Sequence, residues 1–130
     1  MSETINDTTT NTSTSTGSGF QIVREWGING DKRKRYNLCE GPGKNLSDMA
    51  GQRIEVAAYV EIESPDPSTG EIRRVLKFLT TDGECLGTRS NSFISGFERF
   101  LACMESDECT EFEVVKARSS QGRNYILFKA

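Results

Sequence analysis

Histidine is absent from this 130-residue chain, so the commonest general base and metal ligand of enzymes is missing. The sequence also has no nucleophile elbow, no phosphate-binding loop and no pair of closely spaced metal ligands. The acidic stretch from Glu105 to Glu113 lacks the spacing of a calcium loop. We therefore expect a protein that is not an enzyme and that has no cofactor and no metal site.

Long hydrophobic runs are also missing, since no apolar stretch approaches the roughly 18 residues of a membrane span. The polar start of the chain has neither the basic beginning nor the apolar middle of a secretory signal. We expect no membrane association and a cytoplasmic location. The four cysteines, Cys39, Cys85, Cys103 and Cys109, are too widely spaced for a typical zinc motif and are expected to be small buried or surface thiols.

The chain has room for a single hydrophobic core, preceded by a polar leader. Residues 2–19 contain only one aliphatic side chain, Ile5, and cannot offset the entropy of ordering. The sequence predicts a disordered Ser/Thr-rich tail over residues 1–18 and one domain over residues 19–130. Within this domain, residues 19–49 form an N-terminal extension and residues 50–130 form a barrel.

The extension is expected to contain a hairpin. Residues 20–25 alternate as a short strand, residues 27–30 break it, and residues 36–38 return as a second strand. The basic run from Lys32 to Arg35 would then lie near the hairpin tip. Residues 45–49 are expected to form one helical turn before the barrel.

The hydrophobic periodicity of residues 50–130 predicts a five-stranded barrel with one helix. Strands are predicted over residues 53–63, 71–81, 84–89, 111–118 and 124–129, with a helix over residues 92–104 capped by Ser92. Asp82-Gly83 suits a two-residue hairpin turn. The order β-β-β-α-β-β is that of an OB-fold, so we predict a mainly β protein with an OB-like β-barrel. A half-open sheet with one covering helix is the alternative that the periodicity leaves open.

Charge is unevenly distributed in a chain of net charge -3. Residues 20–36 carry five basic and two acidic side chains, whereas residues 92–113 carry one basic and six acidic ones. Such separation can steer a polyanion to one face, although clustered charge is more often only a solvated surface.

Basic and aromatic residues of the extension and of the second and third barrel strands are candidates for binding single-stranded nucleic acid, by phosphate contacts and base stacking. For Phe78 a core position is the stronger interpretation, and Trp26 can equally cap the end of the barrel. For Tyr59 and Tyr125 the binding and structural interpretations are balanced. The predicted nucleic-acid-binding residues are Trp26, Lys32, Arg33, Lys34, Arg35, Tyr36, Tyr59, Arg73, Arg74, Lys77, Phe78, Arg89 and Tyr125.

The segments EVAAYVEIES, RVLKFLTTDGE, SNSFISGFERFL and EFEVVKARSSQGRNYILFK resemble the small single-stranded DNA-binding proteins of Gram-positive bacteriophages, as in protein-primed DNA replication. The resemblance covers roughly three-fifths of the chain and is one of pattern. It implies sequence-independent coating of displaced DNA strands, replication proteins as further partners, and a location in the host cytoplasm. It also makes Tyr59, Lys77 and Tyr125 stronger candidates. RNA binding and a protein–protein interaction module remain alternatives.

Overall fold

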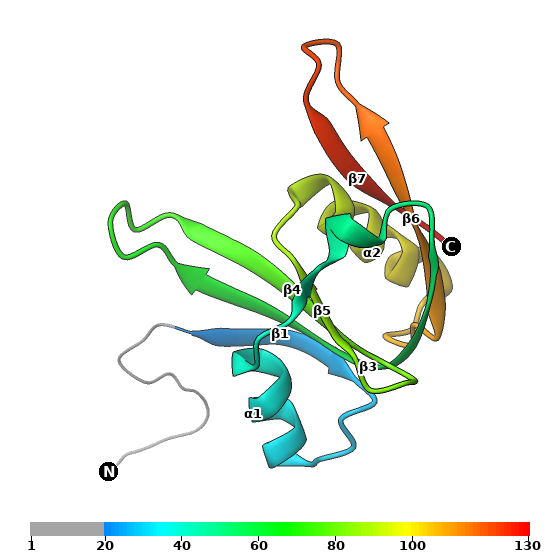
Figure 1. Ribbon diagram of the computed structural model, residues 1–130. Helices are drawn as coiled ribbons and strands as arrows, with labels where there is room; N and C mark the ends of the chain where they lie inside the picture. The colour runs from blue at the N-terminus through cyan, green and yellow to red at the C-terminus, as the bar shows by residue number, and fades with distance from the viewer. Residues whose placement is uncertain (1–19) are drawn as a thin grey trace.

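The computed structural model describes residues 20–130 as a mainly β protein whose long central strand, β3 (Arg53–Pro65), pairs with three others. Its second half pairs with β4 (Ile72–Thr80) on one edge and with β1 (Gln21–Trp26) on the other. Its first residues pair with β6 (Glu111–Arg118). The sheet continues from β4 to β5 (Cys85–Thr88) and the short β2 (Lys44–Asn45), and from β6 to β7 (Asn124–Lys129). The result is a seven-stranded sheet that curls into a half-barrel (Figure 1).

The interior of the half-barrel is filled by aromatic side chains and by α2 (Asn91–Met104). Phe93, Ile94, Phe97 and Leu101 lie on the buried face of this helix. Their spacing of one, three or four residues places them on one side of the helix, as the sequence predicts. Ser90, rather than Ser92, is the N-cap, because its hydroxyl accepts a hydrogen bond from the backbone N–H of Phe93.

A second core lies on the outer face of the sheet, beneath α1 (Lys32–Glu40). Leu38 of this helix is buried in a cluster with Ile28 and with Ala58, Val60 and Ile62 of β3. Because α1 covers one face and α2 the other, β3 is buried on both sides rather than on one.

A β-bulge between Val56 and Ala58 changes which side chains of β3 face the interior. Before the bulge, Ile54 and Val56 join the interior core, whereas Ala58 and Val60 after it lie beneath α1. In the sequence, apolar residues alternate from Ile54 to Ile62, which predicts one continuous apolar face. That prediction is wrong, since the bulge divides these residues between two cores.

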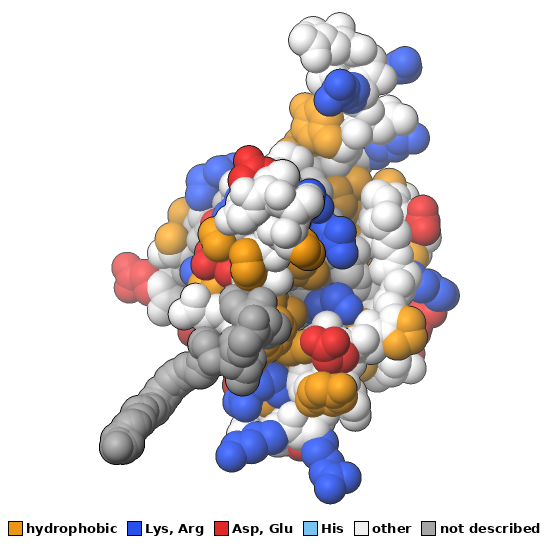
Figure 2. Space-filling model, turned by 90° about the vertical axis from the view of Figure 1, so that its left-hand side faces the viewer, with side chains coloured by type: hydrophobic (Ala, Val, Ile, Leu, Met, Phe, Trp, Pro, Cys, Tyr) orange, Lys and Arg blue, Asp and Glu red, His pale blue; other side chains and the backbone are white. Residues whose placement is uncertain are grey.

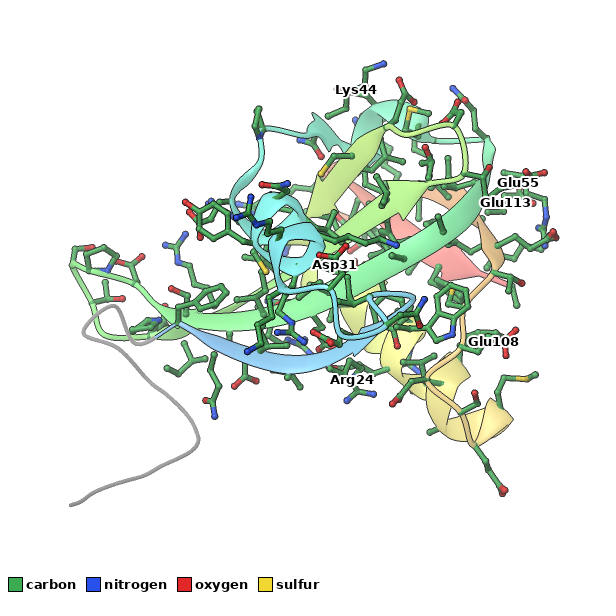
Figure 3. The ribbon with its side chains drawn as sticks, turned by 90° about the horizontal axis from the view of Figure 1, so that it is seen from below. Arg24, Asp31, Lys44, Glu55, Glu108 and Glu113 are labelled. Carbon is green, nitrogen blue, oxygen red and sulfur yellow. The ribbon has the colours of Figure 1, made fainter. Side chains whose placement is uncertain are left out.

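The predicted N-terminal hairpin is also wrong, because residues 32–40 form a helix. The side chain of Asp31 accepts a hydrogen bond from the backbone N–H of Lys34, which caps the helix (Figure 3). Lys, Arg, Leu and Glu all favour helices, and Arg35 forms a paired contact with Glu25 of β1 that holds the helix to the sheet. Residues 36–38 are helical and form no strand.

The five predicted barrel strands are present as β3, β4, β5, β6 and β7, and β1 and β2 add two more. The helical turn expected over residues 45–49 is present as the 3-10 helix η2 (Leu46–Met49). The turn at Asp82-Gly83 differs from the predicted two-residue turn, because of its two residues only Gly83 has a positive φ. The loop between β4 and β5 is longer than predicted and begins after Thr80, whose backbone N–H donates to the backbone oxygen of Glu84. The predicted tail lies outside the described residues. No helix among residues 20–130 has the length and apolar character to cross a bilayer.

Candidate nucleic-acid interface

Two of the predicted stacking residues, Tyr59 and Phe78, lie in the interior core with 0% exposure. The hydroxyl of Tyr59 donates a 2.6 Å hydrogen bond to the backbone oxygen of Asp107, which satisfies it inside the protein. The Phe78 ring contacts the ring of Phe112 with centroids 4.7 Å apart. Neither ring is accessible to a base, so their assignment to a binding surface is corrected to a place in the core.

Trp26 is half-buried at the end of β1 and stacks on Tyr59, with ring centroids 6.4 Å apart and an interplanar angle of 29°. This contact places the indole against the interior core. Trp26 therefore covers one end of the core, which agrees with the alternative that it caps the end of the barrel.

The basic run on α1 divides into two pairs. Lys34 donates to the backbone oxygen of Gly27, and Arg35 forms its paired contact with Glu25, so both are engaged within the protein. Lys32 and Arg33 are exposed, as is Tyr36 one turn further along the helix. Half of this run therefore remains available to a ligand.

The three basic residues of β4 point to opposite faces of the sheet, because side chains alternate along a strand. Arg74 faces α2 and forms an ion pair with Glu98 at 2.7 Å, together with a hydrogen bond to Ser95. Lys77 lies on the α1 side, where it donates to the backbone oxygen of Gly41. Arg73 is exposed and forms an ion pair with Asp66. The three cations do not converge on one groove.

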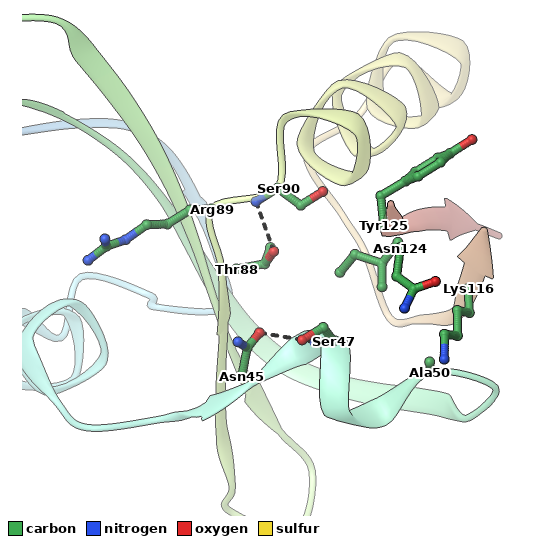
Figure 4. Close-up of a pocket in the computed structure, with 10 residues that line it drawn as sticks. Asn45, Ser47, Ala50, Thr88, Arg89, Ser90, Lys116, Asn124 and Tyr125 are labelled. Carbon is green, nitrogen blue, oxygen red and sulfur yellow. Dashed lines mark hydrogen bonds between the residues drawn. The ribbon is translucent and has the colours of Figure 1, made fainter. Parts of the chain in front are cut away.

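An open seam lies between β5 and β7. Among residues 20–130, β5 pairs with β4 and β2, and β7 pairs with β6 alone, so the two edges of the half-barrel do not join. A cavity of about 510 Å³ occupies this seam (Figure 4). One wall comes from Asn45, Ser47 and Ala50, the second from Thr88, Arg89 and Ser90, and the third from Lys116, Asn124, Tyr125 and Ile126.

The seam carries positive charge and none of its lining residues is a carboxylate. Arg89 and Lys116 lie on different walls, and neither has an ion-pair partner within residues 20–130. The Arg89 side chain extends away from the other lining residues (Figure 4). A second hollow of about 340 Å³ shares Arg89 with the first and is also lined by Arg73, Arg74 and the carboxylate of Glu71. Arg89 therefore connects the seam to the end of β4.

The β6–β7 hairpin extends this basic surface beyond the seam. Lys116 and Arg118 follow Phe112 and Val114 on the inner side of β6, because alternate side chains share one face. Residues 114–130 contain four basic side chains and no acidic one. Figure 2 shows Lys and Arg side chains on this projecting hairpin. Tyr125 is 38% exposed and, by the same alternation, its ring lies on the opposite face of the hairpin from the inward-facing Ile126.

Lys116, Arg118, Arg123 and Asn124 are candidates that the sequence reasoning missed. Their signal was present, because a run of 17 residues without a carboxylate is unusual in an acidic chain. No sequence pattern indicated that Asn45 and Ser47 line the seam, since they reach it only through the parallel pairing of β2 with β5.

A separate group of charges is buried between β1, β3, β4 and α2. Nε of Arg24 lies 2.8 Å from Oε1 of Glu61, whose side chain is fully buried, and Glu98 and Arg74 pair beside them. Burial and the neighbouring carboxylate of Glu98 together raise the pKa of Glu61 to about 8, against the lowering effects of Arg24 and Arg74. This group joins four elements of the fold and does not line the seam.

Comparison of the chain with known protein families, with curated proteins and with solved structures gives no match.

Proposed function

We propose that this protein binds single-stranded nucleic acid along the seam between β5 and β7, chiefly through its phosphates. The observation that carries the proposal is a cavity lined by two cations without an ion-pair partner in residues 20–130 and by no carboxylate, in a chain whose net charge is negative. A strand running from the β6–β7 hairpin past Lys116 to Arg89 would keep its phosphates near cations.

The order and pairing of β3, β4, β5, α2, β6 and β7 support an OB-like architecture for the proposed function. In OB-folds the second and third strands and the loops that follow the first and fourth strands bind oligonucleotides. Here these loops correspond to residues 66–71 and 119–123. The bacteriophage resemblance then suggests coating of single-stranded DNA during replication as the cellular role.

Stacking is a smaller part of this proposal than phosphate contact. Two of the five candidate rings are buried, Trp26 lies on the core, and Tyr36 lies on α1. Tyr125 borders the seam, but its ring lies on the hairpin face opposite Ile126. One stacked base contributes about 1 to 3 kcal/mol, so the remaining affinity must come from cations and should depend strongly on salt.

The Arg89→Ala/Lys116→Ala double variant is expected to bind a fluorescein-labelled 15-nucleotide oligo-dT about thirtyfold more weakly in 50 mM salt, measured by fluorescence anisotropy. The slope of log affinity against log salt should fall by about 1.4, since each phosphate contact to a single strand contributes about 0.7. Lys32→Ala/Arg33→Ala removes the same charge from α1 and should bind within about threefold of the wild type.

Equal affinities for the seam variant and the wild type would place the site elsewhere. A loss in the α1 variant instead would move it to α1. Trp26 does not line the seam, so its fluorescence should change little on binding, whereas strong quenching would indicate a site at the end of β1. A flat titration at low salt would favour the protein-interaction alternative.

A further inference from the structure

The exposed face of α1 combines an aromatic ring with positive charge. Tyr36 is 66% exposed, which makes it the most exposed of the large hydrophobic side chains in residues 20–130. Lys32 and Arg33 lie one turn before it on the same face, because residues three and four apart are neighbours on a helix. Both are exposed, and neither has an ion-pair partner within residues 20–130. Glu40, one turn past Tyr36, ends the basic part of this face.

The corner after α2 has the opposite charge and an exposed apolar side chain of its own. Met104, the last residue of α2, is 59% exposed. Glu105 then turns the chain with a φ of 54°, and it is exposed together with Asp107 and Glu108. None of these three carboxylates has an ion-pair partner within residues 20–130. Residues 104–108 are called the acidic corner below, and Glu108 marks it in Figure 3.

A hollow of about 420 Å³ beside the acidic corner has room for an aromatic ring. Leu101 of α2 gives it an apolar wall, and Glu105 and Asp107 of the corner also line it. Its remaining charged residues are Arg24 and Glu98, one of each sign. The hollow therefore combines apolar surface with an excess of carboxylates, which is complementary to a ring that lies beside cations.

The face of α1 and the acidic corner cannot meet within one molecule. α1 covers one face of β3 and α2 covers the other, so the two surfaces lie on opposite sides of the sheet (Figure 1). Contact between them requires two copies. We infer that the exposed face of α1 docks onto the acidic corner of a second copy of this chain. Tyr36 enters the hollow, and Lys32 and Arg33 face the carboxylates of the corner.

This contact joins two different surfaces, so it adds copies head to tail and does not close at a dimer. One helix face and one corner make a small interface, in the class of transient contacts that bury less than about 1,200 Å². Association is therefore expected at high protein concentration and at low salt, because salt screens exposed charges. Neither surface lines the seam between β5 and β7, so the seam stays open in such an array.

Sedimentation velocity in the absence of nucleic acid tests this contact separately from the proposed function. The wild type is expected to sediment faster as its concentration rises to about 200 µM in 50 mM salt, and as a monomer in about 0.5 M salt. Lys32→Glu/Arg33→Glu and Glu105→Lys/Glu108→Lys each place like charges across the contact, so each should weaken association at least about tenfold. An equimolar mixture of these two variants should restore association, because the reversed charges are again complementary.

Asp48→Lys/Glu71→Lys is the matched control, since it makes the same change of net charge at two exposed carboxylates outside both surfaces. It should associate as the wild type does. Tyr36→Ala should weaken association about tenfold, whereas Ile72→Ala, which truncates a side chain that is 61% exposed on β4, should not. A wild type that stays monomeric in low salt, or a mixture of the two reversed variants that does not associate, would overturn the inference and leave nucleic-acid binding by the seam in place.

Discussion

Replacing Phe78 by alanine is expected to lower the free energy of unfolding by about 3 to 5 kcal/mol. The ring has 0% exposure and lies at the centre of the interior core. Its centroid is 4.7 Å from that of Phe112, 5.7 Å from that of Phe97 and 6.1 Å from that of Tyr59. Truncation removes all of these contacts and leaves a cavity that the surrounding strands and helix cannot fill.

Urea denaturation followed by circular dichroism measures this loss. Because a loss of this size can unfold a small domain outright, Phe78→Leu serves as a second variant and should cost about 1 kcal/mol. Tyr36→Ala is the control, since this ring is 66% exposed on α1 and should change stability by less than about 0.5 kcal/mol. A Phe78→Ala protein as stable as the Tyr36→Ala protein would return Phe78 to the surface as a stacking residue.

The order of strands and the helix of the barrel could be predicted because their periodicities are local. The interior position of Tyr59 could not. In the sequence Ile54, Val56, Ala58 and Val60 alternate without interruption, so Tyr59 is assigned to the polar face. The bulge between Val56 and Ala58 inserts one residue into β3 and turns Tyr59 inward. Nothing in the local pattern marks that insertion.

α1 was misjudged for a different reason. The glycines around Ile28 indicate a turn, and a turn between two short apolar segments is typical of a hairpin. The competing signal was Asp31 before a run of good helix formers, which is a helix start. Once α1 forms, it buries Leu38 and covers the outer face of β3, so the tertiary packing favours the helix as well.

The candidate site depends on topology more than on sequence. Arg89 and Tyr125 were predicted from their residue types. The cavity that they line exists because β5 and β7 do not pair with each other, while β2 and η2 bring Asn45 and Ser47 alongside. Residues so far apart in the chain give no local signal of their proximity. The basic part of the site in residues 114–130 could be predicted from the sequence, because this segment contains basic side chains and no acidic one.

Arg24→Ala is expected to lower the free energy of unfolding by about 3 kcal/mol at pH 9, because the Glu61 carboxyl, whose pKa is raised to about 8, is ionised there and loses its cation. Without Arg24, Glu61 either stays ionised in the interior or holds a proton at a pH above its pKa in the wild type. Either outcome costs free energy. At pH 5 the carboxyl is protonated in both folded proteins, so no buried charge loses its partner and the destabilisation should be clearly smaller.

The pH dependence of the wild type follows from the same group. The pKa of Glu61 is raised to about 8, so between pH 4.5 and pH 8 the folded protein holds a proton that the unfolded chain has released. Stability therefore falls as the pH rises through this window. The lowered pKa of Glu98, caused by its contact with Glu61 and by Arg74, has the opposite sign and acts at more acidic pH.

Glu61→Gln is the decisive variant, because it keeps the shape of the protonated side chain and cannot titrate. Urea denaturation at pH 5, 6, 7 and 8 should show an unfolding free energy for Glu61→Gln that no longer falls over this range. In the Arg24→Ala/Glu61→Gln double variant, the loss caused by Arg24→Ala should shrink to about 1 kcal/mol, because no buried charge is left unpaired. A full 3 kcal/mol loss in that background would mean that Arg24 stabilises the fold by packing along β1 and not by compensating the Glu61 carboxylate.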